Sequence, residues 1–378
     1  MKKSTKKSST TRKLRIAQVA PLWFSVPPSG YGGTESIVSS LTEELIRRGH
    51  TVTLFASGDS RTKAELVSVV KKNLFVLGVP WLHDSYNINN LIEAFSRAKD
   101  FDIIHTHIDV YDPIVRGYNS GTPSLATLHN SFWPIPNDPR KNKRWITYQG
   151  RTLIYERFSM LPYVAISESY RRQCAARINF IKTIYHGVYT NRLRFSPSGG
   201  DYFVWLGRIG QAKGAHVAAR IAKAMGIKLV IAGAIVNPEA EQFFNGHIRP
   251  YLGRNIQYIG ELKSEKEKSE FFGHAKAFLY PLMWEEPFGI TMIESQACGT
   301  PVVAFNRGSV PELVKHGVTG FVVDTFSEFK RAIRNIDSIK RINCRKHVEQ
   351  NFTVEKMADN YENLYYSLLQ RWGKIIGN

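Results

Sequence analysis

The chain has 378 residues, more than one typical hydrophobic core holds and enough for two domains of roughly 180 residues each. Hydrophobic residues make up 43% of it, as in ordinary globular proteins, and no apolar run approaches the ~20 residues that a membrane helix needs. The formal net charge of +19 allows nucleic acid, an anionic lipid surface or acidic ligands as partners, but it excludes no fold. Three scattered cysteines, Cys174, Cys298 and Cys344, fit free thiols in a reducing cytoplasm rather than a disulfide framework or a metal site.

A basic tail precedes the first predicted strand. Residues 14–20 are apolar, but Arg15 and Gln18 interrupt them, which makes a poor signal peptide and a good strand. We therefore expect a disordered tail over residues 1–13 and a cytoplasmic protein. The cations of the tail are Lys2, Lys3, Lys6, Lys7, Arg12 and Lys13.

From Leu14 onward, predicted strands alternate with predicted helices, which indicates doubly wound parallel sheets of the α/β class. The run from Ser196 to Gly200 is rich in serine and glycine and predicts a hinge. The hinge divides the chain into an N-terminal domain over 14–195 and a C-terminal domain over 201–350. The expected strands are 14–20, 51–56, 102–107, 124–130, 163–167 and 181–188, then 202–208, 228–234, 256–260, 277–282 and 301–305.

Two glycines, Gly32 and Gly33, lie at the first strand-to-helix junction, before a helix expected over 34–48. Glycines at such a junction let a ligand approach the backbone closely, although plain turn chemistry needs them too. They form neither a G-x-G-x-x-G dinucleotide fingerprint nor a P-loop.

Two patterns resemble metal sites, and we interpret neither as one. Asp100-Phe101-Asp102 spells a D-x-D, but it precedes a strand, whereas a ligand pair is expected after one. His105 and His107 lie on one face of that strand near Asp109, yet no further ligand completes a set, so polar strand-end residues are the better interpretation.

His129 ends the strand 124–130, where open α/β sheets place ligand groups. A lone histidine there is structural or functional, and the residues alone leave both open. The following segment, 133–157, mixes aromatic and basic residues and reads as a surface patch or a solvated helix face.

In the second half, Arg208 ends a strand and Lys213 follows five residues later, before a helix. Two cations on one strand-to-helix loop suit a diphosphate leaving group, because negative charge develops on its oxygens as the bond to it breaks.

The segment from Glu286 to Glu294 lies between two predicted strands. Pro287 and Gly289 announce a helix start, with free amides at Phe288, Gly289 and Ile290 that suit an anion. Glu294 falls on the apolar stripe of this helix, so its carboxylate needs a partner such as a ligand hydroxyl. A simpler alternative is that each glutamate favours the helix dipole or pairs with a nearby cation.

The whole string Glu-Pro-Phe-Gly, Glu294 and Ala-Cys-Gly-Thr-Pro-Val-Val resembles the E-x7-E signature of retaining nucleotide-sugar glycosyltransferases of family 4, which have the GT-B fold. The loop 30–35 and the pair Arg208 and Lys213 are similar to that family too, especially to its subgroup of avilamycin-type enzymes and enzymes assigned as pterin glucosyltransferases. The resemblance extends from Leu14 to Tyr366. Arg307-Gly308-Ser309 departs from the usual Gly-Gly, which leaves contacts to the donor sugar open.

The resemblance implies two Rossmann-like domains facing a central cleft, with residues 351–378 forming a helix that crosses back to the N-terminal domain. It implies a metal-independent hexosyltransferase that needs no cofactor and uses a nucleoside-diphosphate sugar. A UDP-linked sugar is favoured, and a GDP-linked sugar stays open. The implied catalytic residues are His129, Arg208, Lys213 and Glu286. The implied donor-binding residues are Gly32, Gly33, Arg208, Lys213, Glu286, Phe288, Gly289, Ile290 and Glu294.

Two alternatives and one further partner follow from the same sequence. A sugar-nucleotide epimerase can share the fold. A nucleic-acid-binding protein would explain the charge, but no recognition module is present, so we expect no nucleic acid. The basic tail and the cations from Arg140 to Arg151 either hold the protein against an anionic inner membrane surface that carries a lipid-linked acceptor or only keep the protein soluble. The acceptor is unidentified, and a small molecule, a glycan and a lipid-linked group all stay open.

Overall fold

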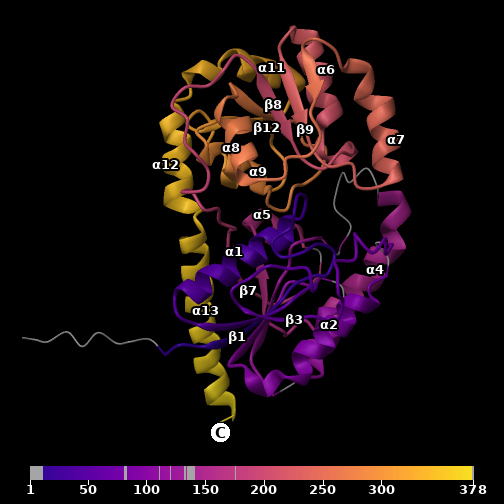
Figure 1. Cartoon of the computed structure of the whole chain (residues 1–378), viewed down its shortest axis with the longest axis vertical. Coiled ribbons are helices and arrows are strands. Elements are labelled where there is room, and N and C mark those ends of the chain that lie inside the picture. Colours follow the sequence, from indigo (N-terminus) through magenta and orange to yellow (C-terminus); the bar gives the residue numbers. More distant parts are fainter. Residues whose placement is uncertain are drawn as a thin grey trace, which may run out of the picture.

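The computed structural model describes residues 12–80, 83–109, 111–119, 121–131, 133, 141–174 and 176–376, and side chains are described outside 141–147 and 374–376. Figure 1 shows two lobes, one above the other, each built around a parallel sheet with helices on its faces. Two helices near the C-terminus run along one side of both lobes.

The N-terminal lobe holds seven parallel strands in the order β3-β2-β1-β4-β5-β6-β7. The chain winds outward from β1 in both directions, so β1 and β4 are adjacent, and Ile16 pairs with Ile103. Ligands of such sheets bind where the winding direction changes. The elements are β1 Arg15–Val19, α1 Gly33–Arg47, β2 Thr51–Phe55, β3 Glu65–Val67, α2 Ser85–Ser96, η1 Ala98–Asp100, β4 Ile103–Thr106, α3 Asp112–Gly117, β5 Ser124–Thr127, α4 Lys141–Arg157, β6 Tyr163–Ala165, α5 Glu168–Gln173 and β7 Phe180–Thr183.

The C-terminal lobe repeats the arrangement with six parallel strands in the order β10-β9-β8-β11-β12-β13. Here β8 and β11 meet where the winding direction changes, and Val204 pairs with Phe278. The elements are β8 Phe203–Leu206, η2 Gln211–Lys213, α6 Ala215–Met225, β9 Leu229–Ala232, α7 Pro238–His247, η3 Arg249–Tyr251, β10 Ile256–Tyr258, α8 Glu265–Gly273, β11 Ala277–Tyr280, α9 Ile290–Ala297, β12 Val302–Phe305, α10 Val310–Leu313, β13 Gly320–Val323, α11 Phe326–Arg334 and η4 Ile336–Ser338.

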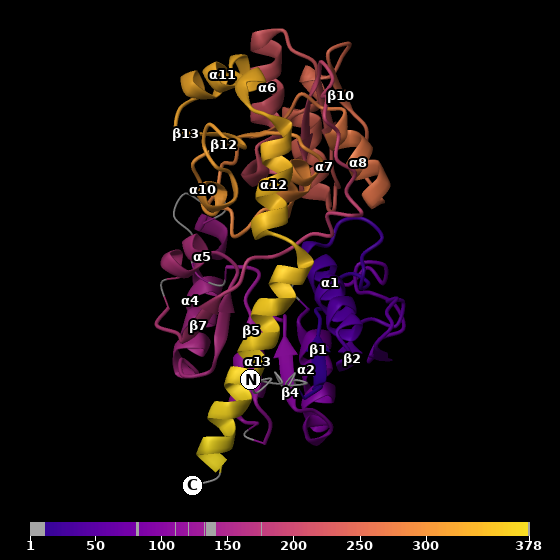
Figure 2. The same cartoon turned by 90° about the vertical axis from the view of Figure 1, so that its left-hand side faces the viewer.

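The last two helices join the lobes. Helix α12, Arg341–Asn351, packs on α9 of the C-terminal lobe, and α13, Val354–Ile376, packs on α1 of the N-terminal lobe (Figure 2). Tyr361 and Tyr365 of α13 are fully buried in the core of the N-terminal lobe. The chain therefore crosses between the lobes at Phe352 and Thr353, where the backbone pairs with Val188.

The two parallel-sheet domains confirm the predicted α/β class and the GT-B architecture. The predicted hinge, 196–200, is bonded to the C-terminal lobe: the Ser196 amide donates to Cys298 and the Gly200 amide to His274. The domain limits drawn from the sequence stay predictions.

Three aromatic residues of the segment 133–157, Trp133, Tyr148 and Tyr155, are buried in the lobe and do not belong to a surface patch. The side chain of Trp145 lies outside the described residues. Arg140 lies outside the described residues, as do Lys2, Lys3, Lys6 and Lys7 of the tail. In the part of the chain that the structure describes, no helix is both long enough and apolar enough to cross a membrane.

Candidate active site

Lys213 and Glu286 meet where the winding direction of the second sheet changes. Lys213 ends the loop after β8, Glu286 lies on the loop after β11, and Lys213 Nζ is 2.5 Å from Glu286 Oε2. The same oxygen accepts from Trp284 Nε1 at 3.0 Å and from Tyr280 Oη at 3.3 Å. The side chains of Lys213 and Glu286 are 18% and 6% exposed, so this carboxylate is held firmly in one position.

The backbone at Glu286 is fixed by the segment that departs from the family pattern. Gly308 has a φ of +57°, and a Cβ on it would lie 2.2 Å from the carbonyl oxygen of Glu286. The Ser309 amide donates to that oxygen at 2.9 Å, and the Gly308 amide donates to Glu285 Oε2 at 2.5 Å. Gly308 is thus required for this close contact, whereas Arg307 lies beside Glu285, 3.7 Å away.

Helix α9 begins directly after this loop. Gly289 is its N-cap with a φ of +81°, Phe288 before it is buried, and Ile290 is the first helical residue. The amides of Gly289, Ile290 and Thr291 donate to no described residue. Unpaired amides at a helix start, with the positive end of the helix dipole, form an arrangement that binds anions.

Glu294 lies one turn further along α9 and is 7% exposed. Its Oε1 is 2.7 Å from Lys268 Nζ of α8, which the sequence did not point to. Burial alone would lower the pKa of Lys268, but the attraction of Glu294 outweighs it, so the pKa of Lys268 is raised. Oε2 of Glu294 is buried and has no partner among the described residues. Because a buried oxygen without a hydrogen bond is costly, a ligand hydroxyl at Oε2 would stabilise the site.

Arg208 follows β8 and has no carboxylate partner among the described residues. Its guanidinium lies 5.9 Å from the ring centre of Tyr31, which belongs to the other lobe. The Tyr31 amide in turn donates to Glu261 of the C-terminal lobe. Gly32 and Gly33 follow at the start of α1, so the structure brings this glycine loop to Arg208.

His129 lies just after β5, and its orientation is set by a chain of buried side chains. His107 bonds Gln18 Oε1 through Nε2 at 2.8 Å and His129 Nε2 through Nδ1 at 2.9 Å. Burial lowers the pKa of His129 to about 3, and the pKa of His107 also lies well below its usual value because it is buried, so both rings are neutral.

The protons in this chain can be placed from the partners. A carbonyl oxygen only accepts, so His107 Nε2 carries the proton, His107 Nδ1 accepts, and His129 Nε2 donates. His129 Nδ1 is therefore left as a hydrogen-bond acceptor. The ring stacks on His186 with centroids 5.1 Å apart, and His186 contacts Phe288 at 4.7 Å, so His129 lies beside the start of α9.

Comparisons with known proteins agree with this geometry. Residues 31–192 match the model "Glycosyltransferase Family 4", and residues 194–351 match "Glycosyl transferases group 1". The chain is a GT-B glycosyltransferase.

Proteins similar to this glycosyltransferase cover it almost entirely. The O-antigen chain mannosyltransferase C of Escherichia coli is 24% identical over 94% of this chain and 99% of its own. The crystal structure of AviGT4, a glycosyltransferase involved in avilamycin A biosynthesis, is 24% identical, with a TM-score of 0.66 over 94% of this chain and 98% of that one. HepE of Anabaena, solved with UDP and glucose and also with UDP-glucose, is 18% identical in the first of these structures, with a TM-score of 0.69 over 94% of this chain and 100% of its own.

The D-x-D pair of the glycosyltransferase, Asp100 and Asp102, lies away from the candidate active site. Asp102 precedes β4, at the opposite edge of the sheet from His129, and it accepts from the Arg15 amide and from Arg12 at 2.8 and 2.7 Å. Asp100 lies 3.4 Å from Arg97. His105 is occupied as well, because it bonds Tyr365 and Thr127 at 2.7 Å each.

Sequence reasoning missed the contacts between the lobes of the glycosyltransferase. Glu312 of α10 accepts from the Glu168 and Ser169 amides at the start of α5, at 2.8 and 2.6 Å, and from Tyr185 Oη at 2.9 Å. Ser167 Oγ donates to the carbonyl oxygen of Pro287 at 2.7 Å. No signal in the sequence links residues so far apart in the chain.

The sequence also does not reveal that two carboxyl groups of the N-terminal lobe, those of Asp109 and Glu35, are buried close enough to interact. Asp109 accepts from the His129 amide at 3.0 Å and from Asn130 at 2.6 Å, and Glu35 lies in the first turn of α1. Burial raises the pKa of Asp109 to about 7 and that of Glu35 to about 8, and their mutual repulsion adds to the second shift. A carboxyl group that carries a proton near neutral pH can donate a hydrogen bond as well as accept one.

Proposed function

We propose that this glycosyltransferase moves a hexosyl group from a nucleoside-diphosphate sugar to an acceptor hydroxyl with retention of configuration. The observation that carries the proposal is the buried Oε2 of Glu294, which has no partner among the described residues and lies one turn after amides of α9 that donate to none of them. A ribose hydroxyl and a diphosphate would satisfy these groups together. HepE, which has the same fold, has been solved with UDP-glucose, and a UDP-linked donor is therefore our first expectation, with a GDP-linked donor second.

Each side chain has a role in this proposal. Arg208 and Lys213 hold the diphosphate together with the amides of Gly289 and Ile290, and they stabilise its charge as it leaves. Glu294 Oε2 accepts from the ribose. Glu286 accepts from hydroxyls of the donor sugar and keeps Lys213 in place. His129 Nδ1 accepts from another sugar hydroxyl, which needs the neutral ring described above.

The transfer step that we infer takes place on one face of the sugar. Glu286 already accepts from Lys213, Trp284 and Tyr280, which suits a binding role better than that of a nucleophile. The bond from the anomeric carbon to the phosphate oxygen breaks, and the acceptor oxygen bonds to that carbon on the same face. The proton of the acceptor hydroxyl passes to the departing phosphate, so no protein base is needed. The two cations replace a metal ion, and we expect turnover to survive EDTA.

A donor screen tests this proposal. The protein is heated with UDP-linked and GDP-linked sugars in turn, because a ligand that binds the folded state raises the melting temperature. The product formed from the best donor is then examined by NMR for the configuration at its anomeric carbon. A product with inverted configuration would contradict the proposal, as would activity that EDTA abolishes and manganese restores. Conversion of the donor without any acceptor would favour an epimerase.

A further inference from the structure

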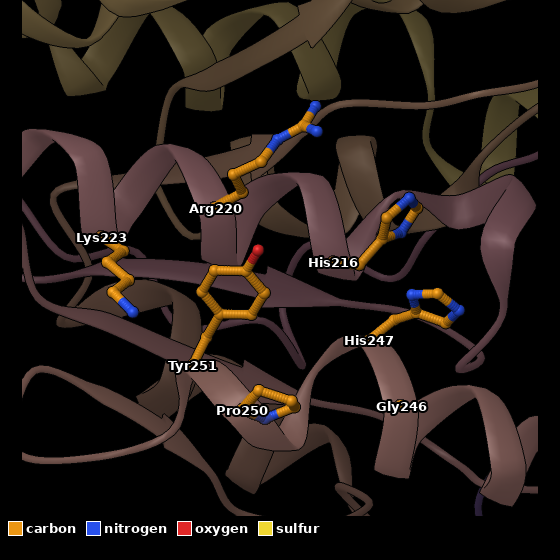
Figure 3. Close-up of a pocket in the computed structure, with 7 residues that line it drawn as sticks. All are labelled: His216, Arg220, Lys223, Gly246, His247, Pro250 and Tyr251. Carbon is orange, nitrogen blue, oxygen red and sulfur yellow. The ribbon is translucent and has the colours of Figure 1, made fainter.

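A pocket of about 340 Å³ lies between α6, the end of α7 and η3 in the C-terminal lobe. Figure 3 shows Tyr251 in the middle of this pocket, Lys223 on one side, and His216 and His247 on the other, with Arg220 along the same helix as His216. The volume lies at the lower end of the range of small-molecule sites. It is separate from the donor-binding groups of the proposed function, none of which lines it.

The basic side chains meet because of their spacing on α6. His216, Arg220 and Lys223 stand at i, i+4 and i+7, which places them on one face of the helix. The opposite face, with Ala218 and Ile221, is buried, and α6 packs on β9, β10 and β11. The basic face is therefore turned toward the end of α7, which supplies His247, and toward η3, which supplies Tyr251.

Within the part of the chain that the structure describes, no carboxylate neutralises the positive charge of this pocket. No acidic residue lines it, and neither Arg220 nor Lys223 forms an ion pair with a described carboxylate, although cations such as Arg116 and Lys268 elsewhere do. Instead Arg220 lies over the ring of Phe326 at 5.3 Å and Lys223 over that of Tyr251 at 5.4 Å.

The environment of His216 also shows the excess of positive charge in this pocket. Burial, followed by repulsion from His247 and Arg220, lowers the pKa of His216 to about 4. Its Nδ1 is also buried and has no partner among the described residues. Like charges gathered around an unsatisfied polar atom are costly, and an anion would remove both costs.

We propose that this pocket binds a phosphomonoester of about the size of a sugar phosphate. Arg220 and Lys223 would pair with the phosphate through charge-assisted hydrogen bonds, Tyr251 and His216 would donate to its oxygens or to hydroxyls beside it, and the volume leaves room for a sugar. The ligand is distinct from the donor, whose diphosphate we assign to Arg208 and Lys213.

The test is calorimetric titration of the full chain with a hexose 6-phosphate and, separately, with the same hexose without phosphate. The wild type is expected to bind only the phosphorylated sugar, and the double variant Arg220→Ala/Lys223→Ala to bind it roughly tenfold or more weakly, the loss of about 1.4 kcal/mol or more. Arg334→Ala is the matched control, since it removes an exposed cation of the same lobe outside the pocket. Equal binding by the double variant would overturn the proposal.

Two further arms identify the source of the phosphate and separate this site from the donor site. If the hexose phosphate does not bind but vesicles with phosphatidic acid sediment the wild type and not the double variant, the phosphomonoester is a lipid headgroup. If neither probe binds, the proposal is wrong. UDP should bind the double variant as tightly as it binds the wild type. Loss of phosphate binding alone would therefore concern this pocket, and absence of UDP binding to the wild type would concern the proposed function.

Discussion

At the scale of single residues, Glu294 serves two purposes, which two substitutions together separate. It neutralises Lys268 through Oε1 and leaves Oε2 for a ligand. We expect Glu294→Gln to weaken donor binding by roughly 1.5–3 kcal/mol, because an amide oxygen accepts less strongly than a carboxylate. It should also lower the melting temperature, since Lys268 loses its counter-charge.

The matched control is Lys268→Gln, which breaks the same ion pair from the other side and leaves the carboxylate in place. Titration of both variants with the donor nucleotide should show the larger loss of affinity for Glu294→Gln. Equal losses would mean that the ion pair matters and that the ribose contact does not.

The second residue-scale prediction concerns Glu35 and pH. Its pKa is raised from 4.5 to about 8 by burial, so between these values the folded state binds a proton that the unfolded chain does not. The free energy of unfolding should therefore fall as the pH rises through this window, by ~5 kcal/mol at most for this group. Glu35→Gln should remove that part of the decline.

Urea unfolding at pH 5.5 and pH 8 measures the effect. Glu239→Gln, at the start of α7, is the control and should decline as the wild type does. If Glu35→Gln and the wild type lose the same stability between the two pH values, Glu35 is ionised in the fold.

At the scale of elements, helix α13 helps to fix the orientation of His129, because its Tyr365 acts on that ring through Gln18 and His107. Tyr365 Oη bonds His105 Nδ1 at 2.7 Å and accepts from Gln18 Nε2 at 3.1 Å, which leaves the Gln18 oxygen facing His107. Removing this hydroxyl frees Gln18 to rotate, and His107 would then no longer be held in one tautomer.

We expect Tyr365→Phe to cost about 1–3 kcal/mol of stability, because it leaves buried polar groups unpaired. Turnover should fall as well, since His129 loses its fixed proton arrangement. Tyr366→Phe is the matched control, because among the described residues that hydroxyl donates to the carbonyl oxygen of Arg12 at the surface and to no buried group. A stable Tyr365→Phe enzyme with full turnover would show that His129 needs no such support.

Most strands and helices could be predicted from the sequence, whereas the side-chain contacts that complete the site could not. Strand and helix alternation predicted both sheets, because parallel strands buried on both faces are short apolar runs. The edge strand β3 is only three residues long and has no such pattern. Gly289 and Pro287 located the start of α9 correctly, but Lys268, the partner of Glu294, lies 26 residues away on a helix with no motif. Tyr365 and His105 are 260 residues apart, and only the folded chain brings them together.

At the scale of the whole molecule, Arg12 is the first residue of the basic tail that the structure describes, and it lies at the edge of the N-terminal sheet opposite His129. Arg12 pairs there with Asp102 at 2.7 Å. We propose that the tail holds the protein against an anionic membrane, at about 1 kcal/mol for each basic residue near the surface. Liposome sedimentation at low and high salt tests this, and a protein that stays in solution with anionic vesicles at low salt would contradict it.

The lobes themselves are joined by Glu312 at α5, by Ser167 at Pro287 and by Tyr31 at Glu261. These contacts place residues of both lobes around the Lys213 and Glu286 pair. Arg208 is the cation of this group that no described carboxylate neutralises, and we propose that a bound diphosphate is its counter-charge.

Calorimetric titration of the donor nucleotide into the wild type and Arg208→Ala tests that assignment most directly. Arg334→Ala serves as the control for a lost positive charge. We expect saturable binding to the wild type and the control, and a loss of roughly 1.5–3 kcal/mol for Arg208→Ala, as for a hydrogen bond to a charged group. Unchanged affinity in a folded Arg208→Ala protein would show that the diphosphate does not bind where we place it.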